Sequence, residues 1–149
     1  MKELLILGAG TSGTMMANHL RKALPKKEWN LTIVDQEETH YYQPGFLFLP
    51  FDLYKTKDVK KKIDKFIPKG VHLIQEKIDR IDKDNDIVIL KNNDIIKYDI
   101  LIIATGTNIA PQEVEGMLGE HCNKSIFDFY TYEGAKNLRK KFSTWEAGK

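Results

Sequence analysis

The chain has 149 residues, of which 42% are hydrophobic and 30% charged, a composition typical of a globular domain with a core. Its 23 Lys and Arg nearly balance 21 Asp and Glu, which disfavours nucleic acid as the main partner, because phosphate binding needs a concentrated basic face. One cysteine excludes an intramolecular disulfide, and no apolar run approaches the roughly 20 residues of a membrane helix. At first, therefore, we expect a soluble, intracellular α/β domain.

The first 35 residues have the pattern of a βαβ unit. Residues 4–7 form an apolar run ending at Gly8, typical of a strand buried on both faces of a parallel sheet. Pro25 ends a predicted helix whose apolar stripe consists of Met16, Leu20, Ala23 and Leu24. Residues 31–34 predict a second buried strand that ends at Asp35. Because such crossovers join parallel strands, we expect a parallel sheet.

The middle of the chain has a different character. Residues 36–53 lack a clear period but are rich in aromatic side chains, so we interpret them as an ordered loop. A short amphipathic helix is predicted from apolar positions between Val59 and Ile67. The lysines at 55–65 are interpreted as a solvent-exposed face, with attraction to a membrane surface as the alternative.

The second half predicts mostly strands. Residues 71–74 are strand-like, and three apolar runs between 77 and 98, separated by Asn and Asp clusters, predict an antiparallel meander. Residues 100–104 predict another fully buried strand, and residues 131–142 a last helix, with a loop at 111–119. The expected fold class is α/β, a Rossmann-like parallel sheet with an antiparallel β-meander.

The strongest motif is Gly8-Ala9-Gly10-Thr11-Ser12-Gly13, which matches G-x-G-x-x-G between a strand and a helix. Gly8 permits the tight turn, Gly10 lets the backbone approach a pyrophosphate, and Gly13 allows close helix–strand packing. Asp35 at the end of the second strand would accept hydrogen bonds from an adenosine ribose and would repel a 2′-phosphate, which disfavours NADP. The motif does not separate FAD from NAD, and a glycine-rich turn without a ligand is the alternative.

Two further segments accompany this motif. The strand that begins after Tyr98-Asp99 ends in the small residues Ala104-Thr105-Gly106, where parallel sheets bind ligands; an ordinary strand-to-loop turn is the alternative. The aromatic loop at 39–46 can lie along a planar ring and exclude water, or it can be a hydrophobic flap on the sheet.

Together these motifs resemble the N-terminal FAD-binding part of the two-dinucleotide-binding-domain flavoproteins. Within that superfamily, the loop Tyr41-Tyr42-Gln43-Pro44-Gly45 is most similar to that of sulfide:quinone oxidoreductases. The resemblance spans about residues 2–142. It implies an FAD site in which the pyrophosphate is held by Gly8, Gly10, Thr11, Ser12 and Gly13, and the adenosine end by Asp35 and Gln36. In the same resemblance, the backbone of Glu76 and Lys77 faces the adenine, and Gln43 and Pro44 lie close to the ribityl–flavin portion. The cofactor would be covered by Ala104, Thr105 and Gly106.

The resemblance also implies that sulfide reacts at a cysteine pair beside the flavin and that two electrons pass through FAD to a quinone. Many relatives carry a cysteine near the position of Phe127, whereas the only cysteine here, Cys122, falls five residues earlier. Cys122 is therefore a candidate catalytic residue, and a plain loop thiol is the alternative. His40 and His121 are candidate proton carriers or structural histidines. No metal site is expected.

We further expect residues 1–149 to be the N-terminal portion of an FAD-binding domain, a fragment without the second dinucleotide domain and the C-terminal segments. Alone it would hold FAD weakly and be inactive. The full-length parent would be cytoplasmic or peripheral on the cytoplasmic membrane face, would meet membranes only through segments absent here, and could form a homo-oligomer. The alternatives are a type II NADH:quinone oxidoreductase, or a related NAD(P)H-dependent flavoprotein, and a non-catalytic nucleotide-binding module.

Overall fold

The computed structural model describes residues 1–146, which form two compact units. The first unit contains residues 1–40 and 62–106, and the second contains residues 41–61 and the segment from residue 107 onward. None of the helices in the described residues is both long enough and apolar enough to span a membrane.

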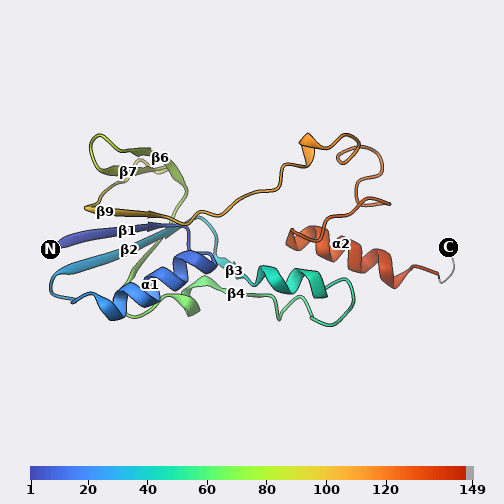
Figure 1. The fold of residues 1–149 in the computed structure, drawn as a ribbon, viewed down its shortest axis with the longest axis horizontal. Helices are drawn as coiled ribbons and strands as arrows, with labels where there is room; N and C mark the ends of the chain where they lie inside the picture. The colour runs from blue at the N-terminus through green and yellow to red at the C-terminus, as the bar shows by residue number, and fades with distance from the viewer. Residues whose placement is uncertain (147–149) are drawn as a thin grey trace. The chain divides into compact units, whose positions relative to one another are not determined.

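The first unit is built on a four-stranded parallel sheet (Figure 1). Its strands, in spatial order, are β5 (His72–Gln75), β2 (Trp29–Asp35), β1 (Lys2–Leu7) and β9 (Ile100–Ile103). Leu4 of β1 pairs with Leu31 on one side and with Ile100 on the other. The predicted parallel sheet is confirmed. Strand β1 lies inside it, and the apolar residues of β1 are almost fully buried.

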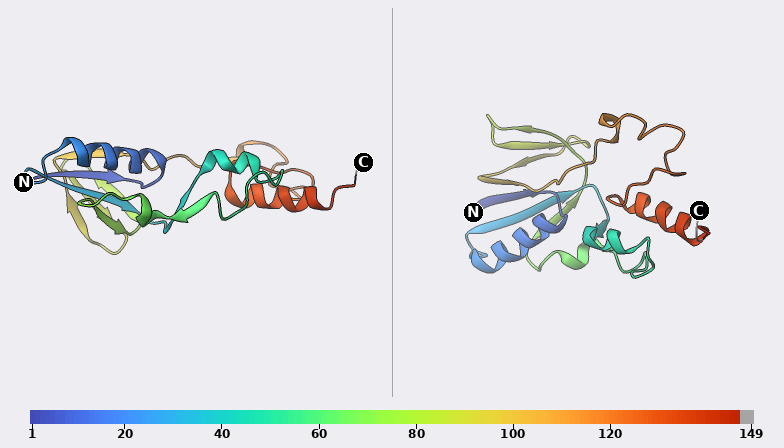
Figure 2. Two further views of the ribbon diagram at one scale, coloured as in Figure 1. Left: turned by 90° about the horizontal axis from the view of Figure 1, so that it is seen from below. Right: turned by 45° about the vertical axis from the view of Figure 1, so that its right-hand side comes forward.

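Opposite faces of the sheet are covered by different elements (Figures 1 and 2). Leu4 and Ile6 point to the side of helix α1 (Thr11–Ala23), where they form a core cluster with Ala17. Leu5 and Leu7 point the other way, because side chains alternate along a strand, and they pack with residues of the meander. The meander consists of β6 (Ile78–Asp82), β7 (Ile87–Leu90) and β8 (Ile95–Lys97), as predicted.

The buried face of α1 differs from the predicted stripe. Met16 is 37% exposed and Ala23 is exposed, whereas Leu20 and Leu24 pack against the core. The buried positions include Ala17 and Arg21. Small residues let the helix approach the sheet closely, so its buried face is rotated away from the larger methionine.

The expectation that residues 100–104 form a fully buried strand is wrong. Ile100 is 44% exposed and Ile103 is 63% exposed. The physical reason is position: β9 is an edge strand of the sheet, and the described residues do not cover these two side chains. Leu101 and Ile102 do pack against the two core clusters.

The second unit has a small core of its own. The 3-10 helix η1 (Gln43–Phe48) and helix α2 (Tyr132–Ser143) contribute Phe46 and Ala135, and the connecting chain contributes Leu49 and Val59. A short 3-10 turn, η3 (Pro111–Glu113), lies in the predicted loop. The predicted last helix is confirmed, and Thr131 caps its N-terminus by accepting a hydrogen bond from the N–H group of Gly134 at 3.0 Å.

The chain between the two units does not contain the predicted amphipathic helix. Strands β3 (Thr39–Tyr41) and β4 (Lys60–Lys62) form a two-stranded sheet, and η2 (Ile63–Phe66) is a 3-10 turn. Val59 belongs to the core of the second unit, whereas Ile63 belongs to the core of the first. A helix would present these two residues, four positions apart, on one face, so the chain between them is extended instead.

Candidate functional site

The predicted nucleotide motifs of the first unit meet at one edge of the parallel sheet. Gly8 follows β1, Asp35 ends β2, Glu76 follows β5, and Ala104 follows β9. The strands are held together up to this edge, where the Gly8 N–H donates to the Val34 carbonyl at 2.7 Å. Ligands of open α/β sheets bind outside the carboxyl ends of the strands, so this edge is the candidate site.

The glycines of the first turn have different roles. A Cβ added to Gly8, which has a φ of 93°, would overlap the Ala104 backbone, and one added to Gly13 would overlap the Gly8 carbonyl. These two glycines are therefore required by the packing of the turn. A Cβ on Gly10 would meet no atom within 4 Å, so Gly10 faces open space that a ligand can fill.

The N-terminus of α1 opens beside this turn. Gly10 is its N-cap residue, no side chain caps the helix, and its first turn contains no acidic residue. The leading N–H groups of Thr11, Ser12 and Gly13 have no partner within a helix. Together with the helix dipole, they form an anion site that suits a pyrophosphate.

The Asp35 carboxylate is held in place by the backbone. One oxygen accepts a hydrogen bond from the Ala9 N–H at 2.6 Å and the other from the Glu37 N–H at 2.9 Å. A carboxylate oxygen can accept more than one hydrogen bond, so both oxygens retain capacity for the hydroxyls of a ribose. The residue that would bind the ribose thus also fixes the glycine-rich turn that would bind the phosphates.

A cavity of about 200 Å³ lies at this edge. It is lined by Gly8, Val34, Asp35, Gln36, Lys77, Ile78 and Thr105. The cavity therefore brings together residues predicted for the phosphate, the adenosine and the covering contacts, although they lie far apart in the sequence.

The backbone of Lys77 is already hydrogen bonded. Its N–H donates to the Glu76 carboxylate at 2.7 Å, and its carbonyl accepts from the Lys91 N–H at 2.8 Å. A contact between this N–H and an adenine therefore requires the exposed Glu76 side chain to turn away. The sequence alone did not reveal this competition.

The segment after β9 continues the edge. The Ala104 N–H donates to the Leu7 carbonyl at 2.7 Å, which extends the β1–β9 pairing. Gly106 has a φ of 74°, and a Cβ added there would meet no atom within 4 Å. Gly106 thus leaves an open backbone surface next to Thr105, which lines the cavity, and its covering contact with a cofactor stays a prediction.

His40 has structural contacts, which is one of the two interpretations that the sequence left open for it. Its Nδ1 lies 3.2 Å from the Ala9 carbonyl, and its ring packs on Phe66 with centroids 4.2 Å apart. His40 therefore links the Ala9 carbonyl of the glycine-rich turn to the Phe66 ring. The only sequence signal was its place in the aromatic loop.

Three predicted site residues belong to the second unit. Gln43 and Pro44 begin η1 and are exposed, and Cys122 is a half-buried free thiol in the long loop before α2. The Cys122 Sγ accepts a hydrogen bond from Asn123 at 3.5 Å. Contacts of Gln43 and Pro44 with a flavin, and a redox role for Cys122, stay predictions.

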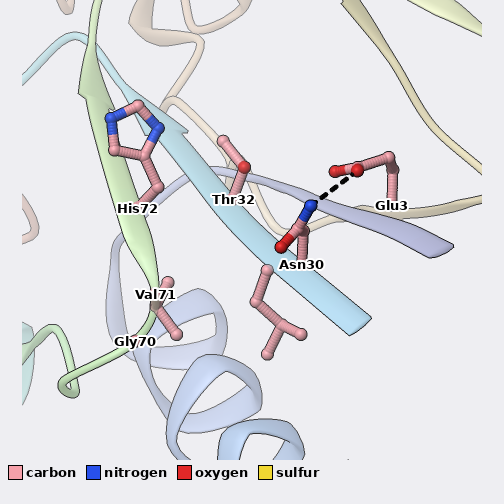
Figure 3. A pocket seen from close by; sticks show the side chains of 7 residues that line it. Glu3, Asn30, Thr32, Gly70, Val71 and His72 are labelled. Carbon is pink, nitrogen blue, oxygen red and sulfur yellow. Dashed lines mark hydrogen bonds between the residues drawn. The ribbon is translucent and has the colours of Figure 1, made fainter. Parts of the chain in front are cut away.

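A second cavity of the first unit, of about 440 Å³, lies elsewhere on the sheet (Figure 3). Glu3, Asn30, Thr32 and His72 line it, with a 2.8 Å hydrogen bond between the first two. These residues belong to the beginnings and middles of their strands rather than to the carboxyl ends, so the cavity is distinct from the candidate site. Within residues 1–146, no cluster of three or more side chains has the composition of a metal site.

Comparison with known proteins gives a consistent result. Residues 2–144 match the family model of the pyridine nucleotide-disulphide oxidoreductases. The mitochondrial sulfide:quinone oxidoreductase of Dictyostelium discoideum is 27% identical over 134 residues, covering 90% of this chain and 29% of that protein. The type II NADH:quinone oxidoreductase of Staphylococcus aureus is 30% identical over 155 aligned positions, covering 99% of this chain and 37% of that protein.

Among solved structures, the sulfide:quinone oxidoreductase of Aquifex aeolicus superposes with a TM-score of 0.76 at 26% identity, covering 96% of this chain and 32% of that chain. The chain thus spans about a third of the length of these relatives. Because the family model covers almost the whole chain, the chain belongs to the pyridine nucleotide-disulphide oxidoreductase family.

Proposed function

We propose that this chain binds FAD at the carboxyl edge of its parallel sheet and forms the FAD-binding part of a sulfide:quinone oxidoreductase-like enzyme. The observation that carries the FAD proposal is the anchored Asp35 carboxylate beside the open Gly10 and the uncapped N-terminus of α1. When bound, FAD would carry two electrons from a donor to a quinone.

The chain's own residues would act by binding and orienting the cofactor. The N–H groups of the first turn of α1 would hold the pyrophosphate, and Gly10 would allow its close approach. Asp35 would hold the ribose, while its bond to the Ala9 N–H keeps the turn in shape. Ala104, Thr105 and Gly106 would cover the cofactor from the β9 side.

Sulfide:quinone chemistry is favoured by the likeness to two such enzymes and by the Tyr-Tyr-Gln-Pro loop. A type II NADH:quinone oxidoreductase is the second candidate, because such an enzyme is 30% identical over 99% of this chain. Sulfide oxidation at a cysteine pair needs more than the one cysteine present, so the donor site would include residues outside this chain.

The binding proposal is tested by titrating the purified chain with ADP and FAD. Replacement of Asp35 with Asn removes the charge that strengthens hydrogen bonds to the ribose, and we expect roughly tenfold weaker binding or more. Asp84→Asn, in the exposed turn of the meander, is the matched control and should bind like the wild type. Equal affinity of Asp35→Asn and the wild type would contradict the assignment.

The donor is tested with the full-length gene product that contains this chain, loaded with FAD under anaerobic conditions. Bleaching of the flavin absorbance by sulfide but not by NADH would support the sulfide:quinone proposal. Bleaching by NADH alone would replace it with the type II NADH:quinone assignment. A protein that binds ADP but not FAD would favour a non-catalytic nucleotide-binding module.

A further inference from the structure

His40 contacts the glycine-rich turn, although the proposed FAD site assigns it no role. Its Nδ1 lies 3.2 Å from the carbonyl oxygen of Ala9. Because a carbonyl oxygen can only accept a hydrogen bond, this contact needs a proton on Nδ1. Ala9 is 0% exposed, so water does not reach its backbone in the folded chain. The imidazole is therefore the partner of a buried backbone acceptor.

The backbone of Ala9 is held on both sides. Its N–H donates to the Asp35 carboxylate at 2.6 Å, and its carbonyl accepts from His40. The Ala9 carbonyl and the Gly10 N–H belong to one planar trans peptide unit and point in opposite directions, so fixing the carbonyl also fixes the N–H. The Gly10 N–H forms no hydrogen bond within residues 1–146 and is available to a ligand.

The orientation of the His40 ring is itself fixed by packing. The ring lies on Phe66, with centroids 4.2 Å apart and an angle of 30° between the planes. Phe66 is tied to helix α1, because its carbonyl accepts a hydrogen bond from the Asn18 side chain at 3.0 Å. All of these residues belong to the first unit. The packing thus limits the directions in which Nδ1 can point.

We propose that His40 is a positioning residue for nucleotide binding, whose Nδ1–H group sets the direction of the Gly10 N–H that meets the pyrophosphate. This inference rests on the proposed FAD site. His40 acts through the Ala9 carbonyl and needs no contact with the cofactor. The gain is preorganisation, because a donor that is already oriented in the free chain loses less conformational freedom on binding. A histidine that served packing alone would contribute through its ring and not through Nδ1.

Two substitutions separate the hydrogen bond from the ring. His40→Phe keeps an aromatic ring on Phe66 and removes the donor, so in calorimetric titrations it should weaken ADP binding roughly 3- to 10-fold, the equivalent of one hydrogen bond. His40→Asn keeps an amide N–H group in place of Nδ1–H and removes the ring. It should bind ADP within about twofold of the wild type, yet unfold at a lower urea concentration than His40→Phe. If packing alone mattered, affinity would follow stability in both variants.

A control variant and a spectroscopic measurement complete the test. His19→Phe changes an exposed histidine of α1 and should bind ADP like the wild type, with circular dichroism confirming that every variant is folded. In nitrogen-15 NMR spectra of the free wild-type chain, the neutral ring of His40 should carry its proton on Nδ1. A proton on Nε2 instead would overturn the proposal, because His40 could not then donate to the Ala9 carbonyl. This measurement does not depend on the folding of any variant.

The outcomes distinguish this inference from the proposed function. If the wild type binds ADP and His40→Phe binds it as tightly, the positioning role is overturned and the FAD site stands. If His40→Asn loses as much affinity as His40→Phe, the ring and not the hydrogen bond matters, and the proposal is again overturned. If the wild type binds neither ADP nor FAD, the proposed function fails and the positioning role fails with it. Weaker binding in His40→Phe that His40→Asn restores, against the order of their stabilities, would confirm the proposal.

Discussion

Replacing Gly10 with alanine should weaken nucleotide binding and leave the fold intact, whereas the same change at Gly13 should weaken the fold itself. Both residues belong to one G-x-G-x-x-G turn, so a comparison of sequences would treat them alike. Their surroundings differ. A Cβ at Gly10 meets no atom within 4 Å, whereas at Gly13 it would overlap the Gly8 carbonyl and lie 3.5 Å from the Ile6 Cγ2.

The expected magnitudes follow from these surroundings. Gly10 has φ −69° and ψ −161°, which any residue can adopt, so alanine should change the free energy of unfolding by less than about 0.5 kcal/mol: the stiffer unfolded chain offsets the poorer N-cap. At Gly13 the added methyl group meets backbone, and overpacking should cost about 1–3 kcal/mol or more. In a complex, the Gly10 methyl group would crowd the pyrophosphate, and a similar cost would weaken ADP binding roughly 5- to 150-fold.

Urea unfolding followed by circular dichroism measures the first quantity, and calorimetric titration with ADP measures the second. Gly10→Ala should match the wild type in unfolding midpoint and differ in affinity, whereas Gly13→Ala should unfold at lower urea concentration. If Gly10→Ala binds ADP as tightly as the wild type, the pyrophosphate does not approach this glycine and the assigned site is wrong. Loss of stability in Gly10→Ala would refute the view that this glycine faces open space.

Arg21→Ala should lower the free energy of unfolding by about 3 kcal/mol in urea titrations, because the buried guanidinium donates to three backbone carbonyls that would lose their partner. A loss below about 1 kcal/mol would argue against a stabilising role of these hydrogen bonds. Thr131→Ala should cost about 1 kcal/mol in the same assay by removing the cap on the Gly134 N–H, and Thr131→Ser should restore most of it. The hydrogen bond from Lys91 lowers the pKa of Asp79 below its ordinary value of 3.8. This lowered pKa contributes stability that is present above pH 3.8 and is lost as the pH falls through the folded-state pKa. Because Lys91→Met removes the hydrogen bond, the Asp79 midpoint in NMR titrations should move back up towards 3.8. An unchanged midpoint would rule out Lys91 as the cause.

Much of the first unit could be predicted from local patterns. The apolar run before Gly8 indicates a strand, because burial on both faces demands continuous apolar side chains, and the small residues after Ile103 mark the carboxyl end of another strand. The meander was equally predictable, since Asn and Asp clusters favour turns between short strands. These signals concern residues that are neighbours in the sequence, and the structure follows them closely.

Predictions failed where contacts between distant parts of the chain decide which side chains are buried. The spacing of Val59 and Ile63 is helical, yet two different cores bury them, and the chain between is extended. Met16 fits an apolar stripe, but the close approach permitted by Ala17 turned another face of α1 to the sheet. Ile103 ends an apolar run and is nevertheless exposed, because its strand lies at an edge.

The sequence by itself determined the class of fold and the residue types of a dinucleotide site, because strand, turn and helix signals act over a few neighbouring positions. Only the tertiary structure decided which glycine faces open space and which is enclosed, since that depends on the backbone of Ala104 and Thr105 beside Gly8 and on the Gly8 carbonyl beside Gly13. It also showed that the Asp35 carboxylate accepts a hydrogen bond from the Ala9 N–H and thereby joins the residue proposed for the ribose to the turn proposed for the phosphates. Such contacts join residues far apart in the chain, and sequence patterns contain no information about the distance between them.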